Sequence, residues 1–100
     1  MKLLFDIMEQ TPGNDLDGIP STWGKVDTQW GEIRPLSGRE YEAAQQMQSS
    51  VTHRIQTHLV ATANSAMRLV AGDRVFEVES VINEGERNRF HVWRCTEGGM

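Results

Sequence analysis

The chain has 100 residues, 38% of them hydrophobic, and its 14 acidic and 10 basic side chains give a net charge of −4. This length predicts one domain, residues 1–100, with a modest core, and the acidic balance argues against affinity for nucleic acid, which requires a basic surface. The single cysteine, Cys95, excludes an intramolecular disulfide. No apolar run approaches the roughly 18 residues of a membrane-spanning helix, so we expect no membrane contact.

Residues 2–8 are predicted to form a strand, because apolar residues alternate with other residues there. Residues 10–21 are rich in Gly, Pro, Asn and Asp, which favour turns, and predict a long, flexible hairpin loop. Structureless loops of about 12 residues or more are usually functional or disordered, so we expect this one to meet a partner. The candidate partner contacts here are Asp15, Leu16, Asp17, Ile19 and Trp23.

Residues 22–34 are predicted to form the second strand, which ends at Pro35 because proline cannot donate to a sheet ladder. Trp23 and Trp30 are seven positions apart, and on a regular strand they would point to opposite sides. Two alternatives stay open for them: both serve the core, or at least one is exposed for a partner.

A short helix is predicted next, over residues 38–48. Ser37 and Glu40 have the spacing of a capping box, in which the serine oxygen accepts a helix amide and the glutamate reaches back to the serine amide. Tyr41, Ala44 and either Met47 or Gln48 form a thin apolar stripe. A helix of about ten residues is unstable alone, so this excursion, residues 35–50, must pack on something.

Four further strands are expected. Residues 50–60 fit a helix or a strand by spacing, and their β-branched residues favour a strand. Segments 66–71, 75–82 and 90–96, joined by short turns, predict a meander. Within the second of these, Phe76, Val78 and Ile82 are expected on one face, with Glu77 and Glu79 on the other.

These elements together predict a mainly β protein: a small antiparallel β-barrel or sandwich with one short helix inserted between the second and third strands. No pattern predicts an enzyme, a cofactor or a metal. His53, His58 and His91 lack metal-ligand spacing. Glu77 and Glu79 share a face but have no sign of the pocket that an acid–base pair needs, and Cys95 has no local nucleophile signature.

The chain resembles the head–tail joining, or head-closure (stopper), proteins of tailed bacteriophages. The most specific part is the Pro-Leu-Ser-Gly-Arg-Glu phrase at 35–40, and the resemblance covers roughly residues 2–97. The remaining matches are Trp30, Ile33, Ala44 to Gln46, residues 51–54, residues 67–69, residues 72–76, residues 81–83 and residues 95–97.

This resemblance implies a structural protein of the virion neck, assembled in the bacterial host cytoplasm. Its copies would form a homo-oligomeric ring that contacts portal or adaptor proteins and tail proteins, and DNA would pass through the channel without specific binding. It also implies that residues 34–50 face the channel. The channel or ring-interface candidates are Arg34, Ser37, Arg39, Glu40, Tyr41, Gln45, Gln46 and Gln48. Two alternatives stay open: a tail-completion or tail-terminator protein, and a small β-barrel binding module.

Overall fold

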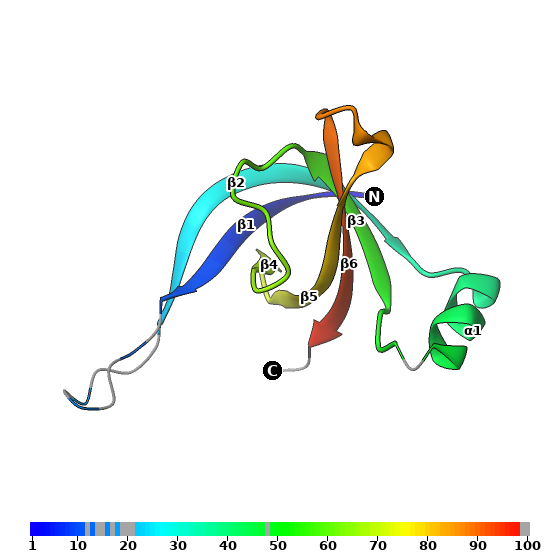
Figure 1. Cartoon of the computed structure of the whole chain (residues 1–100), viewed down its shortest axis with the longest axis horizontal. Coiled ribbons are helices and arrows are strands. Elements are labelled where there is room, and N and C mark those ends of the chain that lie inside the picture. The colour runs from blue at the N-terminus through cyan, green and yellow to red at the C-terminus, as the bar shows by residue number, and fades with distance from the viewer. Residues whose placement is uncertain (12, 14–15, 17, 19–21, 48, 99–100) are drawn as a thin grey trace.

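The fold is a closed antiparallel β-barrel, described here from a computed structural model (Figure 1). The structure describes residues 1–11, 13, 16, 18, 22–47 and 49–98. In these ranges the elements are β1 (Lys2–Thr11), β2 (Thr22–Pro35), α1 (Gly38–Gln46), β3 (His53–His58), β4 (Arg68–Ala71), β5 (Arg74–Asn83), the 3-10 helix η1 (Glu84–Glu86) and β6 (Phe90–Gly98). The strands follow the order β1-β2-β3-β6-β5-β4, and β4 pairs with β1 to close the barrel. The predicted fold class is confirmed.

The barrel interior is filled by apolar side chains that alternate inward along the strands. Phe5 and Phe76 meet edge to face, with ring centroids 5.8 Å apart. The Trp93 indole donates to Thr57 Oγ1 at 2.9 Å, so both buried polar groups are satisfied. The fully buried core side chains include Phe5, Ile7, Ile55, Leu69, Phe76 and Trp93.

A bulge in β2 corrects the prediction for the two tryptophans. The register of β2 against β1 shifts at Val26: Ile7 pairs with Asp27, whereas the next residue, Met8, pairs with Lys25. Trp30 therefore lies opposite Leu4 and Trp23 opposite Gln10, two residues on the same face of β1. Val26 is the extra residue of this bulge. Because it is not counted in the pairing with β1, Trp23 and Trp30 lie on the same face of β2 and both face outward, and Trp30 is 61% exposed. The expectation of opposite sides was wrong.

A second bulge, in β5, corrects the prediction for Ile82. Val78 pairs with Cys95 and Ser80 with Arg94, so Glu79 is the extra residue. Beyond it the alternation reverses: Val81 packs against the core, and Ile82 is half exposed instead of sharing the face of Phe76.

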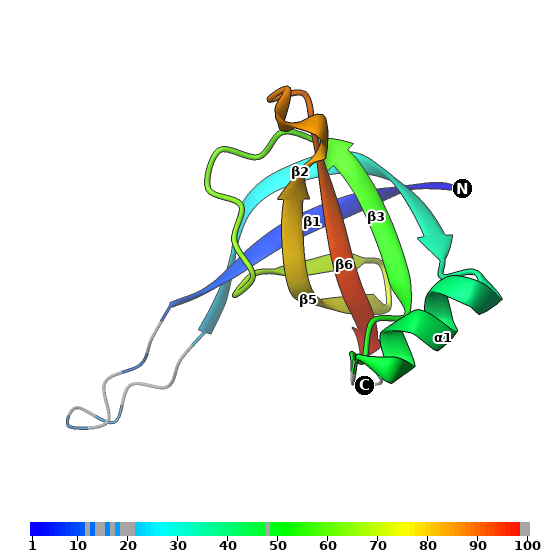
Figure 2. The ribbon, with the colours of Figure 1, turned by 45° about the vertical axis from the view of Figure 1, so that its right-hand side comes forward.

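The first two strands extend beyond the barrel as a two-stranded arm. Residues 9–11 of β1 pair only with residues 22–24 of β2 among the described strands; we call these two segments the arm. The predicted loop thus starts later than expected, because Gln10 and Thr11 belong to β1. Figures 1 and 2 both show the arm on one side of the barrel and α1 on the other.

Candidate functional site

The α1 excursion leaves the barrel where β2 ends at Pro35 and returns before β3. Its base is closed by backbone hydrogen bonds: the Leu36 amide donates to the Thr52 carbonyl at 3.0 Å, and the Thr52 amide donates to the Cys95 carbonyl at 2.9 Å. Val51, at the return, is almost fully buried. The excursion is therefore anchored to β6 at its base, whereas its outer part stands beside the barrel (Figure 2).

Ser37 caps α1 as predicted. Its Oγ accepts the Glu40 amide at 3.3 Å, and its carbonyl accepts the Tyr41 amide at 2.8 Å. The second hydrogen bond of a capping box, from the Ser37 amide to the Glu40 carboxylate, does not form among the described residues. Instead, the Glu40 carboxylate lies 3.9 Å from Arg54 Nη1 and links α1 to β3. The helix ends at Gln46, before the predicted residue 48.

Most candidate residues of this segment point to solvent. Arg34, Ser37 and the α1 residues Arg39, Glu40, Tyr41, Gln45 and Gln46 are exposed, and Gln48 lies outside the described residues. Ala44 is the one buried residue of α1, while Tyr41 is 47% and Met47 79% exposed. The apolar stripe is as thin as predicted, and Met47 is its most exposed member.

Three arginines form a row across the outside of the barrel. Arg34 of β2 lies opposite Arg54 of β3, and Arg54 lies opposite Arg94 of β6; we call these residues the arginine row. Each arginine is one position away in sequence from a buried residue, Ile33, Ile55 or Trp93, so the guanidinium groups point outward. Like charges directly opposite one another destabilise a sheet.

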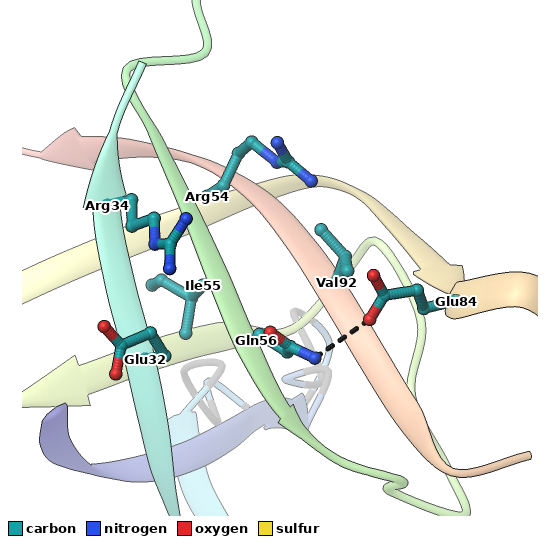
Figure 3. Close-up of a pocket in the computed structure, with 7 residues that line it drawn as sticks. All are labelled: Glu32, Arg34, Arg54, Ile55, Gln56, Glu84 and Val92. Atoms are coloured by element: carbon teal, nitrogen blue, oxygen red, sulfur yellow. Dashed lines mark hydrogen bonds between the residues drawn. The ribbon is translucent and has the colours of Figure 1, made fainter. Parts of the chain in front are cut away.

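Acidic groups near the arginine row offset the repulsion between its guanidinium groups only in part. Among the described residues, Arg54 is the only member of the arginine row that forms an ion pair, and its partner is Glu40. The N-terminal amine, 2.8 Å from Glu32, lowers the pKa of that carboxyl, and Arg34 lowers it further. Figure 3 shows Arg34 and Arg54 beside a shallow pocket of about 160 Å³, where Gln56 donates to Glu84 at 2.9 Å.

A larger groove of about 480 Å³ separates α1 from the outer face of the barrel. Its apolar surface comes from both sides, since Met47 belongs to the helix end and Ile82 to β5, where the bulge turned it outward. Arg54 and Arg94 contribute the positive charge. The lining residues are Leu36, Glu40, Ala43, Ala44, Met47, Arg54, Ile82, Val92 and Arg94; we call this space the α1 groove.

Sequence reasoning missed the arginine row and the α1 groove. The three arginines are widely separated in the chain, and only the strand register brings them together. The alternation of Ile33 with Arg34 and of Arg54 with Ile55 was a usable signal for outward arginines, but not for their alignment.

The candidate partner contacts of the first hairpin are described only in part. Leu16 is 96% exposed, and Asp15, Asp17 and Ile19 lie outside the described residues. Trp23 is half-buried, and the Arg68 guanidinium lies 4.0 Å from the centroid of its ring. Trp23 is thus engaged by its own chain, while Trp30 is the more exposed tryptophan.

The histidines His53 and His91 and the thiol of Cys95 are partly or fully buried in the barrel. Burial lowers the pKa of His53 and of His91, and the His91 ring accepts the Val60 amide at 3.1 Å. Burial raises the pKa of the Cys95 thiol to about 12. Across the described residues, no three side chains of the His, Cys, Asp and Glu types gather in a metal-binding arrangement. The helices in those residues are too short to cross a bilayer.

These features define a small β-barrel with an anchored helical excursion, an outward-facing arginine row and the α1 groove. Residues 5–98 match the family described as phage head completion protein. The chain belongs to this family, which is structural, and it is a virion component that closes the phage head and interacts with other head or tail proteins.

Comparison with individual proteins supports the fold and nothing further. The solution structure of protein SF1141 from Shigella flexneri 2a is similar, with a TM-score of 0.72 and 20% sequence identity over 97% of this chain and 92% of that one. No curated protein matches the sequence.

Proposed function

We propose that this protein forms a homo-oligomeric ring in the neck of a tailed phage, joins the DNA-filled head to the tail and helps to retain the packaged DNA. The match of residues 5–98 to the head completion family carries this proposal. The protein is then a connector subunit that binds portal or adaptor proteins on one side and tail proteins on the other.

Two surfaces of the barrel support the ring. The arm and α1 lie on opposite sides of the molecule (Figures 1 and 2). A ring requires a heterologous contact, in which one surface of a subunit meets a different surface of the next. A protrusion on one side and a groove on the other suit such a contact.

The α1 excursion is our candidate for the segment that faces the channel. Its polar side chains Arg39, Gln45 and Gln46 are exposed. The net charge of −4 suits a channel through which DNA passes without being held. Assembly in the host cytoplasm fits a chain whose one thiol is buried and reduced.

A sorting experiment with a phage lacking this protein tests the connector role. Filled heads and free tails are isolated from that phage, and the purified protein is added to each. Retention on filled heads supports the proposal. Retention on free tails alone would favour a tail-completion protein instead.

A further inference from the structure

We propose that the outer face of β2, β3 and β6 binds an extended segment of another phage protein, which carries a carboxylate and an aromatic side chain four positions apart. This inference rests on the proposed function, because it names the surface by which the connector holds one of its head or tail neighbours. The contact covers neither the arm nor the solvent side of α1, so it is compatible with the ring.

Three rings lie at one end of this face. Trp30 of β2, His58 of β3 and Phe90 of β6 line a shallow pocket of about 190 Å³; we call these residues the aromatic row. The His58 and Phe90 rings are stacked, with centroids 5.3 Å apart, and Trp30 is 61% exposed. Because tryptophan is enriched among the residues that dominate binding energy, this end of the face suits an aromatic ring of the partner.

The arginine row lies at the other end of the same face. On β2 the outward residues Arg34 and Trp30 are four positions apart, which is about 13 Å along the strand. The pocket at the arginine row (Figure 3) and the pocket at the aromatic row share Glu32 and Gln56 as lining residues. The face is therefore continuous, and an extended segment that lies along the strands presents its side chains at the same spacing.

Unbalanced positive charge defines the acidic end of the partner segment. Among the described residues, Arg34 and Arg94 form no ion pair, and Arg54 forms one with Glu40 at 3.9 Å. Both side chains of that pair are about half exposed, so the pair is weak. A partner carboxylate offsets the repulsion within the row and gains charge-assisted hydrogen bonds.

The middle of the face favours a hydrogen-bond donor. Glu32 lies opposite Gln56, and Gln56 donates to Glu84 at 2.9 Å, so two carboxylates line this part. A lysine of the partner, midway between its carboxylate and its ring, meets Glu32 there. The complete pattern of the partner segment is therefore acidic, basic and aromatic at alternate positions.

Single-stranded nucleic acid is the competing occupant, since basic residues beside exposed rings also bind such strands. The two carboxylates disfavour it, because a strand that runs from the rings to the arginines carries its phosphates past Glu32 and Glu84. The net charge of −4 adds to this repulsion. A peptide that is acidic at one end only avoids it.

Fluorescence anisotropy with the purified chain tests the site and its spacing. The probe is a short dye-labelled peptide with glutamate, lysine and phenylalanine at alternate positions and serine elsewhere, made in both sequence orders. One control has glutamine for glutamate, and another has the phenylalanine moved by one position, to the opposite side of an extended peptide. We expect each control to bind about tenfold more weakly than the probe.

Paired arginine variants assign the binding to this face. Arg34→Gln with Arg54→Gln should weaken binding of the probe about tenfold. Lys25→Gln with Arg39→Gln removes the same charge from exposed positions outside the face and should leave binding unchanged. If circular dichroism shows that the first variant is unfolded, Arg34→Gln alone replaces it, with Arg39→Gln as its control.

Two further variants test the ring and the middle of the face. Trp30→Ala should weaken binding about tenfold, whereas Tyr41→Ala, which removes an exposed ring of α1, should not. Replacing the lysine of the probe with glutamine should weaken binding to the wild-type chain about threefold and leave binding to Glu32→Gln unchanged.

Four results would overturn the inference. The first is no binding of the probe in either order, and the second is equal affinity in a variant of the face and its control. The third is a labelled oligothymidine strand that binds more tightly than the probe and loses affinity in the same variants. The fourth is self-association of the chain alone, followed by sedimentation, that Trp30→Ala abolishes, because a second copy then occupies the face.

The filled heads of the sorting experiment separate this inference from the proposed function. If the probe does not bind but the wild-type chain is retained on filled heads, this contact alone is wrong. If the probe binds as expected but the chain is not retained on filled heads, the proposed function alone is wrong.

Discussion

Gly31 occupies the point where β2 passes against the Phe5 ring. A Cβ on this residue would lie 2.8 Å from two atoms of that ring and 3.1 Å from Ile55. Both neighbours are fully buried and have nowhere to move. Glycine is therefore required here for the Phe5 ring and the Ile55 side chain to fit.

Gly31→Ala should accordingly destabilise the protein by about 1–3 kcal/mol through overpacking. Chemical denaturation followed by tryptophan fluorescence measures the change. Gly24→Ala, on the same strand with nothing within 4 Å of its new Cβ, is the matched control and should be near neutral. Equal effects at the two positions would show that the Phe5 ring yields easily.

Cys95 should be chemically silent in the folded protein. Its thiol is fully buried, and its pKa is raised to about 12 by burial, with a further rise from the charge of Glu77. At pH 8 the reactive thiolate is then on the order of one in ten thousand molecules. We expect a thiol reagent to label the protein only after guanidinium unfolds it. Rapid labelling under native conditions would mean that β6 opens readily.

The Arg74–Glu97 pair should make the stability depend on acid pH. Arg74 donates to both Glu97 oxygens, at 2.8 and 3.0 Å, and lowers the pKa of this carboxyl below its usual 4.5. A lowered pKa means that the pair stabilises the fold above pH 4.5 and that this contribution is lost as pH falls below it. Both side chains are about one-third exposed, so the effect should be small.

Arg74→Gln should flatten the loss of thermal stability between pH 5 and pH 3, because Glu97 then titrates similarly in the folded and unfolded chains. Melting curves across this range measure it. Arg87→Gln, an exposed arginine at the end of η1, is the control and should leave the pH profile unchanged. An unchanged profile for Arg74→Gln would mean that the pair contributes nothing in solution.

At the scale of the element, α1 depends on the barrel far more than the barrel depends on α1. The helix buries only Ala44 and is held by its Ser37 cap and the Glu40–Arg54 ion pair. The barrel is closed by strand pairs that do not include the excursion. The helix should therefore be able to fray while the strands stay folded.

Ser37→Ala with Glu40→Ala tests this independence. We expect a loss of about 1 kcal/mol in local helix stability and faster amide exchange in residues 38–46, with the exchange of β5 and β6 amides unchanged. Leu69→Asp, which places a charge in the core, is the control that should unfold the domain. If the capping variant unfolds the domain as fully as Leu69→Asp does, α1 is part of the core, and the channel-facing assignment of residues 34–50 fails.

Strand positions follow from the sequence because alternation records which face is buried, and β1, β5 and β6 lie close to their predicted ranges. The bulges at Val26 and Glu79 could not be predicted in this way, since one extra residue reverses the alternation without a change in composition. The predicted faces of Trp23, Trp30 and Ile82 failed for this reason. The arginine row was equally hidden, because it depends on the register of three strands.

At the scale of the whole molecule, the charges of the chain are distributed unevenly rather than evenly mixed. Three arginines align on one face although the net charge is −4, so the remaining surface is more acidic than the average suggests. An uneven charge distribution of this kind orients a protein as it approaches a partner surface of opposite charge. The sequence predicted the family and its helical excursion, but the alignment of the three arginines became visible only in the folded barrel.

The most direct measurement of the central claim uses filled, tailless heads from a phage that lacks this protein. The purified wild-type chain is added, and the release of packaged DNA is followed by its sensitivity to nuclease. If the protein closes the head as a ring, the DNA becomes protected, and several copies remain bound to each head after sedimentation. Heads that bind the protein but still release their DNA, or that bind a single copy, would contradict the account.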